Sequence, residues 1–152
     1  MRILIAYDSL SGNTHTLAKM LSDKLESEGY SADFFNTSRV SDQDMEKFSL
    51  NYYDIYFLGT WTTGMGKNSG RLAPKMKKFV GILTDKGGNI PNNVAVFGTG
   101  DAEFGHSFCA GAKKLGEFMK TEYDVLIIEQ RPDNYDFEKL SLWVDKILKH
   151  KN

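Results

Sequence analysis

Short apolar runs recur along the chain, and each is followed by a polar or glycine-containing stretch. These runs are Ile3–Tyr7, Ile55–Leu58, Val94–Phe97 and Val125–Ile128. Short continuous apolar runs bounded by turn residues are typical of strands buried on both faces of a parallel sheet. A weaker alternation over residues 31–36, around Phe34, predicts an additional edge strand. The pattern therefore predicts five strands.

Between these runs, apolar residues recur three or four positions apart, as they do on one face of a helix. The four groups are Leu17, Ala18, Leu21 and Leu25; Leu72, Met76, Phe79, Val80 and Leu83; Phe108, Ala112, Leu115 and Met119; and Leu140, Val144, Ile147 and Leu148. Gly29 is the expected end of the first helix. Ser41 and Asp44 resemble a capping box, which predicts a further short helix with Met45 and Phe48 facing inward. Alternating strands and helices predict a single α/β domain over residues 1–152, with helices on both faces of a parallel sheet.

Composition narrows the functional classes. The 152 residues carry a net charge of −1, with 41% hydrophobic and 26% charged residues, as in soluble globular proteins. This balance gives no support for nucleic acid or an anionic membrane as a partner. The single Cys109 excludes an internal disulfide framework and fits a reducing compartment. The first apolar run is too short for a signal peptide, so we expect a cytoplasmic protein, and a monomer. The three histidines are not grouped as metal ligands, so no metal is expected.

The stretch from Ser9 to Thr14 lies between the first strand and the first helix. Backbone N–H groups at a helix N-terminus favour an anion, and Gly12 allows the backbone to approach it closely. No Lys or Arg occurs between Asp8 and Thr16, so neutral donors would hold a phosphate here, which favours a buried monoester. The alternative is that these are ordinary turn and capping residues. Two later loops, residues 60–70 and 98–105, follow strands that would end at the same edge of the sheet.

Three motifs in these loops resemble the flavodoxin family. They are Ser9-Leu10-Ser11-Gly12-Asn13-Thr14, Leu58-Gly59-Thr60-Trp61-Thr62-Thr63-Gly64, and Phe97-Gly98-Thr99-Gly100-Asp101 through Phe108-Cys109. The resemblance spans the whole chain in order and has no room for the insertion of long-chain members. It implies a flavodoxin-like three-layer sandwich, with strand order 2-1-3-4-5 and FMN as the cofactor. It also implies an electron carrier rather than an enzyme, working between an NAD(P)H-dependent flavodoxin reductase and acceptor redox proteins.

The resemblance also implies roles for individual residues. Ser9, Leu10, Ser11, Gly12, Asn13 and Thr14 would surround the phosphate, with Thr60 or Thr62 closing over it. The flavin ring would lie among Trp61, Thr63, Gly64, Met65 and Gly66 of the second loop and Thr99, Gly100, Asp101, Phe104, Gly105, Phe108 and Cys109 of the third. Phe104 occupies the place of an aromatic residue stacked on the outer face of the ring. The peptide after Gly64 is expected to turn over when the flavin is reduced.

The second loop departs from the family pattern, and these departures leave alternatives open. Thr63 and Met65 stand where the family often has an aromatic and an acidic residue. Three arrangements are open. Trp61 could stack on the flavin from a shifted position, Met65 could cover the inner face of the flavin, or Trp61 could pack beneath the loop without contacting the flavin. The run from Thr60 to Gly66 also resembles the flavodoxin-like activator of class Ib ribonucleotide reductase, which is the alternative function. A flavin-dependent quinone reductase is a third class.

Overall fold

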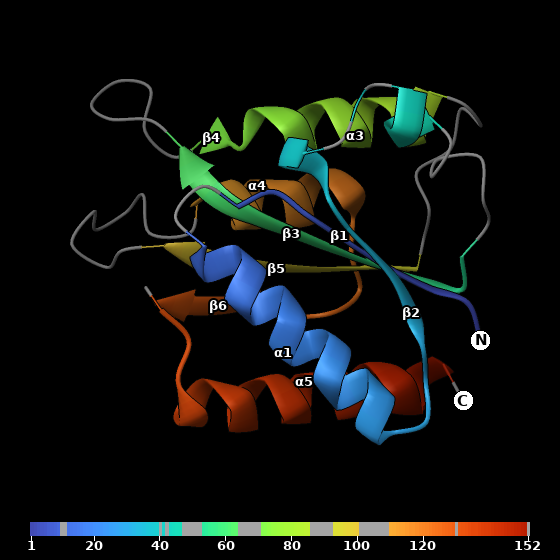
Figure 1. Ribbon diagram of the computed structural model, residues 1–152, viewed down its shortest axis with the longest axis vertical. Coiled ribbons are helices and arrows are strands. Elements are labelled where there is room, and N and C mark those ends of the chain that lie inside the picture. The colour runs from blue at the N-terminus through green and yellow to red at the C-terminus, as the bar shows by residue number, and fades with distance from the viewer. Residues whose placement is uncertain are drawn as a thin grey trace.

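The computed structural model describes residues 1–9, 12–39, 41, 43–46, 53–63, 71–85, 93–100, 110–129 and 131–151, without the side chains of 62, 63, 71, 72 and 85. The strands are β1 (Ile3–Tyr7), β2 (Ala32–Asn36), β3 (Ile55–Thr63), β4 (Arg71–Leu72), β5 (Val94–Gly100) and β6 (Leu126–Glu129). The helices are α1 (Asn13–Ser27), η1 (Thr37–Arg39), α3 (Pro74–Asp85), α4 (Ala110–Met119) and α5 (Asn134–Lys151). Figure 1 shows their arrangement.

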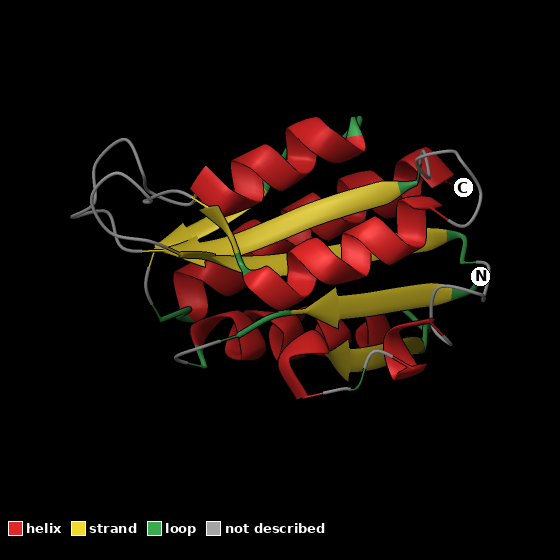
Figure 2. Cartoon of the chain, turned by 90° about the horizontal axis from the view of Figure 1, so that it is seen from above, coloured by secondary structure: helices red, strands yellow, loops and turns green. Residues whose placement is uncertain are grey.

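The long strands form a parallel sheet in the order β2-β1-β3-β5-β6, with β4 paired to β3 outside this path. Without β4 this is the predicted order 2-1-3-4-5, so the predicted fold is confirmed. Helices cover the sheet on both sides (Figure 2). Strand order reverses at β1, which lies between β2 and β3. In open α/β sheets, ligands bind at the carboxyl ends of the strands on either side of such a reversal.

Each face of the sheet has its own apolar core, because successive strand residues point to opposite faces. Ile3 and Ile5 of β1 join the core under α1 and α5, together with Phe57 of β3. Leu4 and Leu58 join the core under α3 and α4. Burying one such side chain contributes about 1.5–3 kcal/mol, so the two cores hold the sheet between its helical layers.

Strand β3 is longer than its apolar run predicts. Hydrophobicity ends at Leu58, but Thr60 and Trp61 still pair with Gly98 and Thr99 of β5. Beyond them, Thr62 and Thr63 pair in antiparallel fashion with β4. The prediction of a loop was therefore wrong for residues 60–63, because main-chain hydrogen bonds continue a strand without apolar side chains, while residues 64–70 lie outside the described part of the chain.

Helix ends follow local sequence signals in most places. Helix α1 ends before Gly29, where Tyr30 N–H donates to Leu25 O at 2.9 Å and Gly29 N–H donates to Glu26 O at 3.0 Å, as in a Schellman motif. The predicted capping contact at residue 41 is present, since its hydroxyl accepts from the N–H of Asp44 at 3.3 Å. Helix α3 begins at Pro74, so Leu72 lies in β4 rather than in the helix as predicted.

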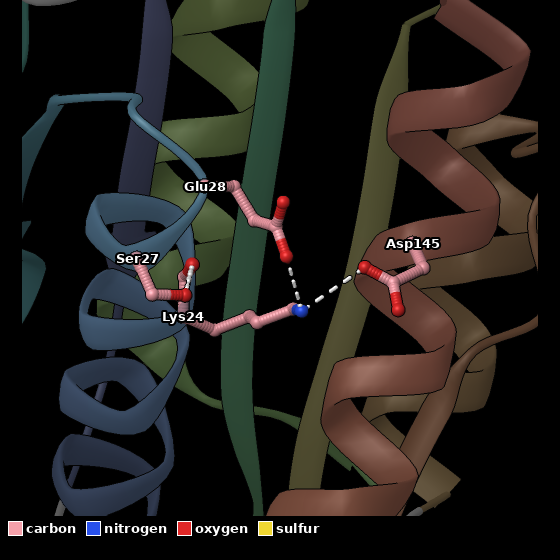
Figure 3. Close-up of polar contacts among 4 residues, drawn as sticks. All are labelled: Lys24, Ser27, Glu28 and Asp145. Carbon is pink, nitrogen blue, oxygen red and sulfur yellow. Dashed lines mark hydrogen bonds and ion pairs between the residues drawn. The ribbon is translucent and has the colours of Figure 1, made fainter.

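The two helices on one face of the sheet are joined by an ion-pair network (Figure 3). Lys24 of α1 contacts Glu28 at 2.6 Å and Asp145 of α5 at 3.0 Å. Its ammonium group donates to Glu28, and this contact and Asp145 raise the Lys24 pKa above its usual value of 10.5.

Among the helices described, none is long and apolar enough to cross a membrane.

Candidate functional site

Helix α1 begins at Asn13, six positions after Tyr7, the last residue of β1. Gly12 is the N-cap residue, with a φ of 95° and no side-chain cap. This left-handed conformation suits glycine and points the first N–H groups of the helix outward. The Ser9 hydroxyl accepts from His15 N–H at 3.1 Å, and its own proton has no acceptor among the residues that the structure describes.

A hydroxyl pair joins this turn to the end of β5. Thr14 Oγ1 and Thr99 Oγ1 lie 2.7 Å apart, and the two residues are 1% and 3% exposed. One hydroxyl of such a pair donates to the other, so one proton of the pair is left over. This spare proton is buried beside the first turn of α1, where it suits an acceptor oxygen of a ligand.

Thr60 is fully buried, and its hydroxyl forms hydrogen bonds with main-chain groups. It donates to Trp61 O at 2.8 Å and accepts from Ala73 N–H at 3.3 Å, next to the start of α3. Its single proton is therefore already in use. Of the two residues proposed to close over a phosphate, Thr62 is described only by its backbone, which pairs with Leu72.

Trp61 is half-buried and packs against the core under α3 and α4. Its indole N–H donates to Asp8 Oδ1 at 3.2 Å, which joins the end of β3 to the end of β1. Nothing in the sequence pattern connected these two residues. Asp8 resembles an ordinary loop residue, and its indole partner lies 53 positions later.

An aromatic cluster lies beside the first loop on the β2 side. Tyr7 Oη hydrogen-bonds to His15 Nδ1, and the Tyr7 ring packs against Phe34 with centroids 5.1 Å apart. Burial raises the pKa of the Tyr7 phenol above 10.0, while the charge of Arg39 opposes this shift. The phenol therefore stays protonated at neutral pH, and this side of the loop carries no negative charge from it.

The structure brings together residues from all three predicted loops. Ser9, Gly12, Asn13 and Thr14 lie next to the ends of the strands that carry Thr60, Trp61, Thr99 and Gly100. Other predicted site residues lie outside the described part of the chain: Leu10, Ser11, Gly64, Met65, Gly66, Asp101, Phe104, Gly105, Phe108 and Cys109. Their roles remain predictions.

The described donors fit a phosphate monoester. They include the N–H groups of Asn13 and Thr14 at the positive end of the α1 dipole, which favours an anion. To these are added the hydroxyl of Ser9 and the spare proton of the Thr14–Thr99 pair. The nearby Asp8 carboxylate would oppose an anion, but both its oxygens face other donors, Trp61 and Met76.

A surface cavity of about 400 Å³ lies elsewhere, between the segment that precedes β6 and helix α5. It is lined by Tyr123, Leu142 and Trp143 among others, and by none of the predicted site residues. The candidate site is therefore identified by the hydrogen-bond donors at the carboxyl ends of β1 and β5 and not by this cavity.

The chain is similar in sequence and in structure to known proteins. A profile of the family described as Flavodoxin matches residues 5–122. A curated relative, the "Protein MioC homolog" of Haemophilus influenzae, is 28% identical over 129 residues, covering 85% of this chain and 81% of its own length. Oxidised flavodoxin 2 from Bacillus cereus is 27% identical, with a TM-score of 0.78 and 99% of both chains covered. A flavodoxin from Streptococcus pneumoniae TIGR4 is 22% identical, with the same TM-score and coverage.

Proposed function

Because this chain belongs to the flavodoxin family, we propose that it binds FMN and carries single electrons between a reductase and acceptor enzymes. The observation that carries this proposal is the donor set at the carboxyl ends of β1 and β5. It combines the left-handed Gly12, the first N–H groups of α1 and the buried Thr14–Thr99 pair. Such a set suits one phosphate group and offers no cationic side chain for a diphosphate.

In this proposal Ser9, Ser11, Gly12, Asn13 and Thr14 hold the phosphate. Thr62 closes over it, because the Thr60 hydroxyl already donates within the fold. The ring of the cofactor lies between the second and third loops. The bound FMN supplies the capacity to accept and release electrons one at a time. The chain supplies binding, orientation and exclusion of water.

The partners proposed for this carrier are an NAD(P)H-dependent flavodoxin reductase and acceptor redox proteins. The proposed site occupies one end of the sheet. A carrier of this kind depends on a reductase for its electrons, whereas a quinone reductase oxidises NAD(P)H by itself.

Three measurements test the proposal and its alternatives. Mass spectrometry of the cofactor released from purified protein should identify FMN, and FAD or the absence of any flavin would refute the site assignment. Reduction by NADPH or NADH should require added reductase. Turnover of NAD(P)H by the protein alone would identify an enzyme instead. Restored metal-centre assembly in a class Ib ribonucleotide reductase subunit would favour the activator function over the general carrier.

A further inference from the structure

Asp8 is a buried carboxylate at the junction of three elements. The residue is 3% exposed and follows the last residue of β1. Its Oδ1 accepts from the indole N–H of Trp61 at 3.2 Å, and its Oδ2 accepts from the backbone N–H of Met76 at 3.3 Å. Its own N–H donates to Gly59 O at 3.0 Å. Asp8 therefore connects the ends of β1 and β3 to the start of α3.

A buried carboxylate needs compensation, because removing a charge from water is costly. Among the described residues, no Lys, Arg or His forms an ion pair with Asp8; the ion pairs that they form lie elsewhere. Met76 is the third residue of α3, so Oδ2 lies at the positive end of that helix dipole. The helix start thus stabilises the charge and leaves Oδ1 for the indole.

This arrangement gives Trp61 a charge-assisted hydrogen bond, which is about twice as strong as a neutral one. Trp61 lies two residues beyond Gly59 and pairs with Thr99, so it stands where the first and third loops meet β3. We propose that Asp8 is a positioning residue that fixes the Trp61 indole as a preformed wall of the cofactor site. This inference rests on the proposed function, since the wall is useful only if a flavin ring lies beside it.

The simpler role for Asp8 is that of a cap for α3 alone. Asp133 provides a matched comparison, because its Oδ1 accepts from the N–H groups of Tyr135 at 3.0 Å and Asp136 at 3.1 Å at the start of α5. Asp133 is exposed and lies far from the three loops in sequence. A capping role predicts similar behaviour for the two aspartates. A positioning role predicts that only Asp8 affects Trp61.

The first test needs no cofactor. The chain has two tryptophans, and the other indole, that of Trp143, donates to Asp124 O at 2.6 Å. Both indole N–H signals can be followed by NMR in ¹⁵N-labelled protein. Asp8→Asn removes the charge and leaves one acceptor oxygen for two donors, Trp61 and Met76, so the Trp61 signal should shift as its hydrogen bond weakens while the Trp143 signal stays in place. Asp133→Asn should shift neither. An unchanged Trp61 signal in Asp8→Asn, or equal shifts of both indoles, would overturn the proposal.

The second test measures the dissociation constant of oxidised FMN in Asp8→Asn, Trp61→Phe and the double variant. Loss of a preorganised aromatic wall should weaken binding by about tenfold in each single variant. The double variant should bind about as weakly as either single one, because the two residues act as a unit. Asp133→Asn should bind like the parent. Multiplying losses in the double variant would show that Asp8 does not act through Trp61.

The two tests separate the inference from the function on which it rests. If the parent protein binds no FMN, the proposed function fails, while the NMR comparison still decides whether Asp8 holds Trp61. If FMN binds and Asp8→Asn releases the indole without weakening binding, the carrier function stands and the wall assignment fails.

Discussion

The two ends of the parallel sheet use buried polar groups in different ways. Among the described residues, the buried polar side chains at the carboxyl ends of the strands are Asp8, Thr14, Thr37, Thr60 and Thr99, whereas the amino ends have Asn93. At the amino ends, Asn93 Nδ2 donates to Tyr53 O and to Asp54 O, both at 2.7 Å. There both amide protons of Asn93 are donated to main-chain carbonyls, so this side chain has no donor left for a ligand. We call the amino ends the closed end and the carboxyl ends the open end.

At the carboxyl ends, the Thr37 and Thr60 hydroxyls also donate to main-chain carbonyls, but those of Thr14 and Thr99 pair with each other. Within the described parts of the chain, the second proton of the Thr14–Thr99 pair meets no acceptor, and Ser9 Oγ only accepts, from His15 N–H. Buried polar groups can therefore form a rigid joint, as Asn93 does, or leave donors for a ligand, as we propose for Thr14 and Thr99. What distinguishes them is whether the donors are exhausted within the fold.

The largest expected effect on stability is at the closed end. Asn93→Ala leaves the carbonyls of Tyr53 and Asp54 without their buried donor. The free energy of unfolding should fall by about 2–4 kcal/mol, measured by urea denaturation. The FMN dissociation constant of the folded variant should stay within about twofold of the parent value, since the two ends are distant. A large loss of affinity would show that the ends are coupled.

The next effect concerns the open end. Thr99→Val keeps the side-chain shape but removes one hydroxyl of the Thr14–Thr99 pair. FMN binding should weaken by about tenfold, while unfolding free energy falls by only about 1 kcal/mol. Calorimetric titration with FMN checks the first value. Thr37→Val is the matched control, because the Thr37 hydroxyl is equally buried but donates to Tyr7 O at 3.1 Å. Equal loss of affinity in both variants would contradict a ligand role for the pair.

A smaller effect is expected for backbone strain in the first turn of α1. In Gly12→Ala the new Cβ meets nothing within 4 Å, but the φ of 95° is unfavourable for alanine. The cost should be about 1–2 kcal/mol, divided between stability and FMN affinity. Gly81→Ala, in the middle of α3 with equally open space, should instead stabilise by about 0.5–1 kcal/mol. Effects of the same sign would mean that the Gly12 turn relaxes freely.

The smallest effect belongs to the network around Lys24. Lys24→Met should lower stability by about 0.5 kcal/mol at neutral pH, because the partners Glu28 and Asp145 are 42% and 52% exposed and screened by solvent. The raised pKa means that the contribution is fully present below the unfolded value of 10.5 and is lost as pH rises through the higher folded pKa. Urea denaturation from neutral to strongly alkaline pH measures this difference. A difference between parent and variant that grows with pH would contradict it.

Apolar runs predicted the strands well because burial on both faces requires them. The run Ile3–Tyr7 is a strand with the predicted bounds, and helix α1 ends before Gly29 as predicted. The extension of β3 to Thr63 was missed because main-chain pairing leaves no mark in hydrophobicity. In β2, Phe35 rather than Phe34 is buried, because Phe34 packs beside Tyr7 at the sheet edge.

The geometry of the candidate site was predictable where local sequence determines it. Gly12 follows a strand and opens a helix, so its special conformation could be anticipated. The contact between Asp8 and Trp61 could not, because it depends on where α3 begins and on how far β3 extends. The Thr14–Thr99 pair was likewise hidden, although both residues were predicted in the site. Proximity across the sheet follows from strand order, but the partner of a hydroxyl does not.

The Thr14–Thr99 bond spans 85 residues of sequence, which has a consequence for biosynthesis. At about 5–20 residues per second, Thr99 is added some 4–17 seconds after Thr14. During that interval β3 has no β5 to pair with, and the apolar face of α1 remains without α5 for longer still. A nascent chain therefore completes the proposed cofactor-binding end only after most of it has been translated. If this end binds FMN as proposed, binding follows the synthesis of β5.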